Sequence, residues 1–299
     1  MFHVSTIQHP LTLVASPQEF YERVHPLIER AATNGAQLVV LPNYTGLMLL
    51  GVIVRAEQKS LALGELARAG NFATVSELLC TAAPGMRDFY LQIFSTLAKR
   101  ARVFLAPGTV VEMHAGRLYN TAYLFTPEWT VVGSQKQTHR TSREIAWGLS
   151  QGEELSVWDI GDARIGFVVG TDVAHPEVAR ILALQNANLL IHPAAYPTYH
   201  DEYFLLDLWR DVQGNQIFGV QSCAGGEFRG KSAIYAPVEM TRAHTGILAQ
   251  ATSADGEEII RASLDFDALQ KNLDAYSVFD FFNYGFYARA FPSTYRGRV

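Results

Sequence analysis

Three positions along the chain carry residue types that could bind or transform a small polar molecule. Asn43 follows the apolar run at residues 38–41, Lys136 lies in the middle of the chain, and Gly170 follows the apolar run at residues 165–169. A lysine ammonium can stabilise negative charge that develops on a substrate heteroatom. An asparagine amide donates and accepts hydrogen bonds, so Asn43 is predicted to be a satisfied polar residue at a strand end or to hold a polar ligand, but it cannot act as a general base. Gly170 is predicted to be a turn glycine and supplies no nucleophile, so these positions offer a cation and a polar contact without a base or a nucleophile.

Other residues could complete a site around Lys136. Glu144 lies eight residues further along and is a candidate ion-pair partner for a buried ammonium. Thr171 and Cys223 are candidate ligand contacts. Cys223 could also be a relocated nucleophile, or simply a half-buried structural thiol. A merely exposed Lys136 and a structural Lys136–Glu144 pair are alternatives to an anion-binding role.

The sequence predicts neither a metal site nor a cofactor. None of the nine histidines shows zinc-ligand spacing with cysteine or carboxylate partners. The chain also lacks a phosphate-binding loop and a dinucleotide glycine fingerprint.

The elements that must position these residues alternate between strands and helices. The apolar runs predict strands at residues 38–41, 103–106, 165–169, 189–192 and 217–222, and an antiparallel pair at 118–125 and 130–133. Helical spacing predicts helices at residues 20–32 (with Gly35 as C-cap), 64–79, 87–100, 176–185 and 203–213. This order favours a mixed sheet, or two packed sheets, flanked by helices.

Composition excludes several classes of function. The 299 residues are 48% hydrophobic and 18% charged, which suits one large α/β unit. The net charge is −5 and no Lys/Arg block stands out, so we expect neither nucleic-acid nor membrane binding. Residues 1–10 do not read as a signal peptide, and the longest apolar runs are too short to span a bilayer. Two cysteines give no disulfide framework, which favours the cytoplasm.

Motifs along the chain resemble those of the nitrilase (carbon–nitrogen hydrolase) superfamily. The resemblance covers residues 31 to 273 approximately. Besides the three segments around Asn43, Lys136 and Gly170, it rests on residues 31–36, 116–122, 175–180, 187–193, 228–232 and Pro237, in family order. It implies a four-layer α-β-β-α sandwich. We therefore predict one nitrilase-like domain at residues 1–273, followed by an aromatic-rich tail at 274–299.

The resemblance also implies what the site should contain. Members of the superfamily use a Cys nucleophile, a Glu general base and a Lys between two carboxylates. Here Asn43 stands at the base position and Gly170 at the nucleophile position, while Lys136 and Glu144 are predicted to be retained. Asp172 matches the aspartate that follows the nucleophile, and we expect it to bond or cap the loop before the helix at 176–185.

Three functions compete on these grounds. The first is a pseudoenzyme with a vestigial or small-ligand-binding pocket around Lys136, which would take an amide, nitrile or carboxylate. The second is an amidase or lyase of altered chemistry that uses Lys136, Glu144 and a water or Cys223. The third is an ordinary hydrolase with misaligned motifs, although neither Cys80 nor Cys223 lies in a Cys-x-Asp sequence.

The C-terminal tail predicts self-association. Residues 279–287 are rich in aromatic side chains, which are expected to be buried on the domain itself or on a partner. Superfamily members commonly pair sandwich to sandwich. The resemblance therefore implies a homodimer or a higher homo-oligomer.

Overall fold

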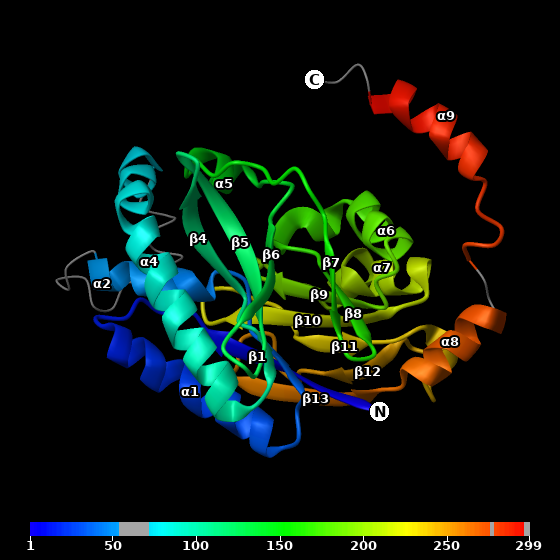
Figure 1. Ribbon diagram of the computed structural model, residues 1–299, viewed down its shortest axis with the longest axis horizontal. Helices are drawn as coiled ribbons and strands as arrows, with labels where there is room; N and C mark the ends of the chain where they lie inside the picture. The colour runs from blue at the N-terminus through cyan, green and yellow to red at the C-terminus, as the bar shows by residue number, and fades with distance from the viewer. Residues whose placement is uncertain (54–71, 276–277, 296–299) are drawn as a thin grey trace.

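The computed structural model describes residues 1–53, 72–275 and 278–295, and it has four layers (Figure 1). Helices α1 (Pro17–Thr33) and α4 (Phe72–Ala101) cover one face of the sandwich. Helices α6 (Pro176–Leu184) and α7 (Leu208–Asn215) cover the opposite face. Two packed layers of strands lie between them, so the predicted α-β-β-α sandwich is confirmed.

The first strand layer contains the N-terminal half of the chain. Its strands are β1 (Phe2–Pro10), β2 (Leu38–Val40), β3 (Phe104–Ala106), β4 (Thr109–His114), β5 (Arg117–Phe125), β6 (Val131–Lys136) and β13 (Glu258–Leu264). The order along the layer is β4-β5-β3-β2-β1, with β6 paired to β5 and β13 paired to β1. Strands β1, β2 and β3 run parallel, whereas β5 and β6 form the predicted antiparallel pair.

The second strand layer contains most of the C-terminal half. Its strands are β7 (Val157–Ile160), β8 (Ala163–Phe167), β9 (Leu189–Ala194), β10 (Phe218–Gly225), β11 (Ala233–Tyr235) and β12 (Ile247–Gln250). Strands β8, β9 and β10 are parallel neighbours. The end of β1 pairs with β10 through His9 and Ala224, which joins the two layers.

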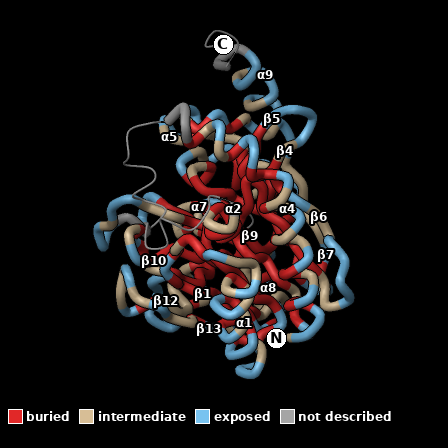
Figure 2. Tube along the Cα trace, turned by 90° about the vertical axis from the view of Figure 1, so that its left-hand side faces the viewer, coloured by how far each residue is buried: buried red, intermediate tan, exposed pale blue. Residues whose placement is uncertain are grey.

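Three apolar clusters hold the layers together. Figure 2 shows that the buried segments of the chain lie in the interior of the molecule. The cluster beneath α1 and α4 includes Phe20 and Phe94, whose rings meet edge to face at 5.6 Å. The middle cluster lies between the two strand layers and includes Leu38 and Ile165. The cluster beneath α6 and α7 includes Leu182. Strand β2 is buried along its whole length and contributes residues to the first two clusters, as expected of a strand that is covered on both faces.

Local signals set the ends of α1. The Ser16 hydroxyl accepts a hydrogen bond from the Glu19 N–H at 3.0 Å, and Pro17 begins the helix. Asn34 is the C-cap residue. Gly35, predicted to cap this helix, is the next residue and has φ +88°, a conformation that glycine adopts without strain.

Three predicted helices differ from the structure. The predictions at 64–79 and 87–100 become one helix, α4, which continues through Pro84, and residues 64–71 lie outside the described chain. The prediction at 203–213 is interrupted at Asp207. A 3₁₀ turn, η3 (Asp201–Leu206), precedes that residue and α7 follows it.

Short elements connect the layers and complete the chain. They are η1 (Thr45–Leu49), α2 (Leu50–Ile53), α5 (Ser142–Ala146), η2 (Gly170–Ala174), η4 (Val238–Met240), α8 (Phe266–Ala275) and α9 (Tyr284–Tyr295). Figure 1 shows α9 leading away from the body of the molecule. None of the helices in the described ranges combines the length and apolar character needed to cross a bilayer.

Candidate functional site

A cluster of buried amide side chains lies where three of the predicted site residues, Asn43, Glu144 and Gly170, come together. Asn43, just beyond β2, is only 2% exposed. Its Oδ1 accepts hydrogen bonds from Thr109 Oγ1 at 2.7 Å and from Asn120 Nδ2 at 3.0 Å. The same Asn120 nitrogen donates to Gln137 Oε1 at 2.7 Å. One amide nitrogen therefore holds Asn43 and Gln137 together, and the prediction that Asn43 is a satisfied polar residue is confirmed.

Gln137 joins this cluster to a buried carboxylate. Its Nε2 donates to the His139 carbonyl at 2.6 Å and to Glu144 Oε2 at 3.1 Å. Glu144 is 1% exposed and forms a capping box with Thr141 at the start of α5. The Tyr44 hydroxyl donates to its other oxygen. Burial, reinforced by the Glu144 charge, raises the pKa of Tyr44 far above its usual range, so the phenol remains a donor.

Gly170 begins η2 directly beside this cluster. Its φ of +53° confirms the prediction of a turn glycine. A Cβ atom built at this position would lie 2.9 Å from Asn43 Nδ2 and 3.2 Å from Gln137 Oε1. The two amides therefore fill the space into which a side chain at position 170 would extend.

Asp172 ties the cluster to the loop that follows β6. Its carboxylate accepts hydrogen bonds from the Thr138 N–H at 3.0 Å, the Thr138 hydroxyl at 2.8 Å and the His139 N–H at 2.6 Å. The expectation that Asp172 bonds the loop before α6 therefore holds for its main-chain carbonyl, which accepts from the His175 N–H at 3.0 Å, but not for its carboxylate. The His139 ring stacks on His175 with centroids 3.6 Å apart, and burial, together with His139, lowers the pKa of His175.

Lys136 lies on the opposite side of the chain from the amide cluster. Its Nζ stands 4.3 Å from the centroid of the Tyr119 ring, and the side chain lines a groove of about 490 Å³. Side chains alternate between faces along a strand, so Lys136 and Gln137 at the end of β6 point in opposite directions. The predicted Lys136–Glu144 ion pair was wrong, because Glu144 bonds Gln137, Tyr44 and Thr141 instead.

Thr171 and Cys223 do not extend the site around Lys136. Thr171 follows Gly170 within η2 and is partly exposed. Cys223 lies in β10 and is fully buried, with Gln221 Nε2 3.4 Å from its sulfur. Burial raises the pKa of this thiol, with a further contribution from Asp207, so the nucleophilic thiolate is disfavoured. Of the two alternatives for Cys223, this burial favours the structural thiol over the relocated nucleophile.

The sequence could have revealed part of this arrangement. Strand alternation, applied to the end of the predicted antiparallel pair, places Lys136 and Gln137 on different sides. The hydrogen bonds of Asn120 and Thr109 carried no comparable local signal, because their partners are 77 and 66 residues away. Within the part of the chain that the structure describes, no group of three or more His, Cys, Asp or Glu could hold a metal ion.

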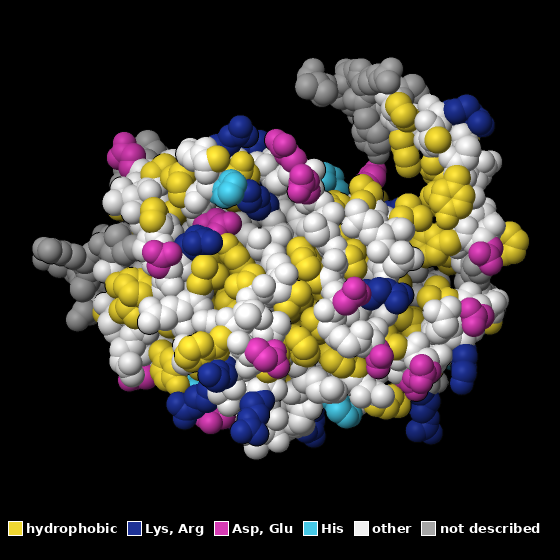
Figure 3. Space-filling view, in the orientation of Figure 1, with side chains coloured by type: hydrophobic (Ala, Val, Ile, Leu, Met, Phe, Trp, Pro, Cys, Tyr) yellow, Lys and Arg dark blue, Asp and Glu magenta, His cyan; other side chains and the backbone are white. Residues whose placement is uncertain are grey.

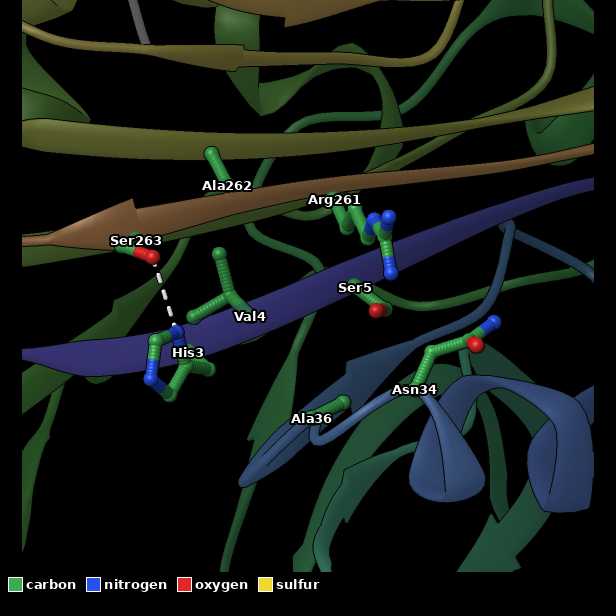
Figure 4. Close-up of a pocket in the computed structure, with 8 residues that line it drawn as sticks. All are labelled: His3, Val4, Ser5, Asn34, Ala36, Arg261, Ala262 and Ser263. Carbon is green, nitrogen blue, oxygen red and sulfur yellow. Dashed lines mark hydrogen bonds between the residues drawn. The ribbon is translucent and has the colours of Figure 1, made fainter.

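A second hollow, of about 340 Å³, lies where β1 and β13 meet the end of α1 (Figure 4). His3 Nδ1 and Ser263 Oγ are 2.8 Å apart at one side of it. The Arg261 guanidinium extends toward Ser5 in the same view. Its lining contains none of the predicted site residues.

Comparison with solved structures supports the fold. A carbon-nitrogen hydrolase from Helicobacter pylori G27 superposes with a TM-score of 0.75 at 19% identity, over 96% of this chain and 97% of that one. Saccharomyces cerevisiae Nit3, a nitrilase superfamily member, gives a TM-score of 0.68 at 22% identity, over 92% and 93%. The amidase from Nesterenkonia sp. AN1 gives 0.66 at 19% identity, over 90% and 96%.

Sequence comparison identifies the family. The probable hydrolase YhcX of Bacillus subtilis is 24% identical over 90% of this chain, and omega-amidase NIT2 of Danio rerio is 26% identical over 66%. The chain spans only 50% of the length of the first relative and 65% of the second. The sequence model of the carbon-nitrogen hydrolase family matches residues 3–271, and the chain therefore belongs to the carbon-nitrogen hydrolase family.

Proposed function

We propose that this protein is a carbon-nitrogen hydrolase family member that binds small polar ligands without cysteine-dependent hydrolysis of amides or nitriles. One observation carries the proposal. The amide side chains of Asn43 and Gln137 pack against Gly170, where a base, a cation and a nucleophile would have to meet.

The chemistry explains why this cluster is unsuited to hydrolysis. The reaction requires a thiolate, a base to generate it and a cation to stabilise the developing charge. The superfamily resemblance implies that the lysine lies between two carboxylates. In this chain the side chain that links Asn43, through Asn120, to Glu144 is that of Gln137. We infer that Gln137 stands in place of the lysine, so that base, cation and nucleophile positions are all neutral.

The loss of several groups together fits a site that no longer performs this reaction. Members of a catalytic unit act jointly, so removing a second member costs little once the first is gone. Cys223 offers no replacement, because its thiol is buried and its pKa is raised. Among the relatives, omega-amidases and the Nesterenkonia amidase, whose active-site cysteine reacts with acrylamide, indicate that small amides are the ligand class to test.

The experiment is an ammonia-release assay on a panel of small amides and nitriles, with zebrafish omega-amidase as the positive control. The wild-type protein is expected to release no more ammonia than a protein-free blank. Release that disappears in Cys223→Ala would overturn the proposal in favour of a relocated nucleophile. Release that disappears in Lys136→Ala or Glu144→Gln would support the altered amidase instead.

We also propose that the protein is a homodimer or higher homo-oligomer held in part by its C-terminal tail at residues 274–299. Four aromatic side chains of this region are exposed, namely Phe281 (91%), Tyr284, Phe286 and Phe291. Hydrophobic side chains gather along α9 in the space-filling view (Figure 3). Such a surface is more typical of an interface than of a solvated arm. Light scattering should give the mass of a dimer or larger for the full chain and a smaller mass for a chain ending at residue 278. A monomeric full chain would contradict this.

A cytoplasmic location is the final part of the proposal. It is supported by Cys80 and Cys223, which are both free rather than disulfide-bonded. Cell fractionation with an antibody against the protein is the direct test, and recovery in an oxidising compartment would contradict it.

A further inference from the structure

The groove beside Lys136 is separate from the amide cluster and has walls of opposite charge. Lys136 and Arg117 contribute two cationic side chains, and Glu153 and Glu154 contribute two anionic ones. In the described part of the chain, no ion pair within 4.0 Å joins these four residues to one another or to other side chains. The groove therefore has charges of both signs that are available to a ligand.

The position of the Lys136 ammonium is fixed by an aromatic ring rather than by an acid. Its Nζ lies 4.3 Å from the Tyr119 centroid, a cation–π distance. Tyr119 is buried and lines the groove, whereas Lys136 is only half-buried. The ammonium is thus held at the groove surface while its hydrogen-bond donors remain open to a partner.

The acidic wall is also held in place. The buried side chain of Gln135 donates from Nε2 to the Glu154 carbonyl at 2.6 Å and accepts at Oε1 from the Ser156 N–H at 3.2 Å. The Gly152 N–H donates to the Gln137 carbonyl at 2.7 Å. A Cβ on Gly152 would lie 2.7 Å from the Lys136 carbonyl oxygen, so the loop lies directly against β6. The acidic loop is therefore attached to β6, the strand that carries Lys136, and this part of the groove is formed before a ligand arrives.

We propose that this groove binds a small zwitterion, whose carboxylate meets Lys136 and Arg117 and whose ammonium meets Glu153 and Glu154. The volume, about 490 Å³, is in the range of small-molecule sites. A ligand with a carboxylate alone would leave the acidic wall facing its negative charge, and an amine alone would face the cationic wall. Only a ligand with both charges is complementary to both walls.

This inference deepens the ligand-binding part of the proposed function, and it rests on that function only for the expectation of binding without turnover. The probes can therefore be chosen to lack any hydrolysable C–N bond. If ammonia release from amides is found, the proposed function fails, but the binding results with these probes are unaffected. If the probes do not bind, the groove proposal fails and the hydrolysis result still stands.

The test is isothermal titration calorimetry at low ionic strength with 5-aminopentanoate, pentanoate and pentylamine, which share one carbon chain. The full-length protein should bind 5-aminopentanoate at least about tenfold more tightly than either singly charged probe. Equal affinity for pentanoate would overturn the proposal in favour of a simple anion site. Absence of heat with 5-aminopentanoate at about 10 mM would overturn it altogether.

Matched variants separate the groove from general charge effects. Lys136→Ala, and Glu153→Gln combined with Glu154→Gln, should each weaken 5-aminopentanoate binding by at least about tenfold. Lys99→Ala is the control, because Lys99 Nζ lies 3.9 Å from the Trp129 ring centroid and so makes the same kind of contact elsewhere. An equal loss of binding in Lys99→Ala would contradict a site at Lys136.

Discussion

The side chains of Lys136 and Gln137 lie on opposite sides of the chain, and the polar groups on the two sides differ in how far they are hydrogen-bonded. On one side, Gln137 enters a cluster in which the acceptor oxygens of Asn43 and Glu144 are occupied by neighbouring donors. On the other side, Lys136 faces a solvent-open groove whose charged groups form no ion pair with any residue that the structure describes. Two adjacent residues at the end of β6 thus have different surroundings. Gln137 belongs to a buried hydrogen-bond network, and Lys136 belongs to a surface that is open to a ligand.

This difference indicates which of the two regions is better suited to bind a ligand. Buried polar groups with satisfied hydrogen bonds rigidify a structure, and removing one partner is costly. Exposed charges add little to stability, so unpaired charges gathered around a groove are better explained by a ligand than by folding. The cluster at Asn43, Gln137 and Gly170, where the resemblance places the family's catalytic residues, has the first character, and the Lys136 groove has the second.

The largest expected effect is the removal of the buried carboxylate. Glu144→Ala leaves the Tyr44 hydroxyl and the Thr141 N–H without their acceptor and removes one of the two acceptors of Gln137 Nε2, so it should lower the free energy of unfolding by about 3–5 kcal/mol. Glu154→Ala in the groove should change it by no more than about 0.5 kcal/mol. Urea denaturation measures the free energy of unfolding of both variants. Similar losses in the two would contradict the claim that only the buried side is structural.

The next effect tests crowding around Gly170. Gly170→Ala should lower the free energy of unfolding by about 2–4 kcal/mol, because the left-handed backbone and the close approach of Asn43 Nδ2 both oppose a Cβ. Gly116→Ala is the control. That glycine has φ +76° and no atom within 4 Å of the built Cβ, so it should show the strain alone, about 1–2 kcal/mol. A loss no larger in Gly170→Ala would mean that the cluster has room for a side chain.

The dependence of stability on pH distinguishes the amide side chains of the cluster from an ionisable residue elsewhere in the fold, because amides do not titrate. Burial raises the pKa of Asp211, on α7, to about 6 even though Arg210 beside it acts in the opposite direction. At pH values between about 4, the pKa of this carboxyl in the unfolded chain, and about 6, its pKa in the folded protein, the folded state binds the proton more tightly. Stability from this group is therefore present below the window and is lost as the pH rises through it.

Asp211→Asn should remove this dependence, a difference of about 2 kcal/mol across the window relative to wild type. Thermal denaturation from pH 4 to pH 7 measures it. In contrast, Asn120→Ala should lower stability by a similar amount at every pH, because it breaks neutral hydrogen bonds to Asn43 and Gln137. A pH slope that survives in Asp211→Asn would assign the proton to another group.

The smallest effect is expected on the open side. Lys136→Ala removes a half-exposed cation–π contact with Tyr119 and should cost less than about 1 kcal/mol. Lys99→Ala, which loses the equivalent contact with Trp129, should cost about the same. A much larger loss in Lys136→Ala would indicate that Lys136 is a structural residue rather than a ligand-binding one.

Much of the fold could be predicted because its strands are continuous apolar runs. Residues 38–41 and 165–169 correspond to β2 and to the end of β8, and the helix predicted at 176–185 is α6. Strand β1 escaped prediction although it lies in the middle of the fold. Its polar residues are paired with distant partners, as when Thr6 donates to the Gln221 carbonyl at 2.9 Å, and such pairing leaves no local signal.

The candidate site could be predicted only in part for the same reason. The turn conformation of Gly170 and the satisfied amide of Asn43 followed from residue type. Either Lys136 or Gln137 could face Asn43 and Gly170, because a shift of one residue in the strand alternation at the end of β6 exchanges the two side chains. The resemblance alone did not decide between them. The burial of Cys223 depends on the packing of β10 against distant segments, which composition cannot supply.

The most direct test of the central claim is the reactivity of the two cysteines toward acrylamide, followed by mass spectrometry of the intact protein. Cys80 is exposed and Cys223 is buried, so the native protein should gain one adduct, and Cys80→Ala should gain none until it is unfolded. This result would mean that the folded protein presents no activated thiol. Rapid modification of Cys223 in native Cys80→Ala would contradict the account, because it would reveal an active-site nucleophile.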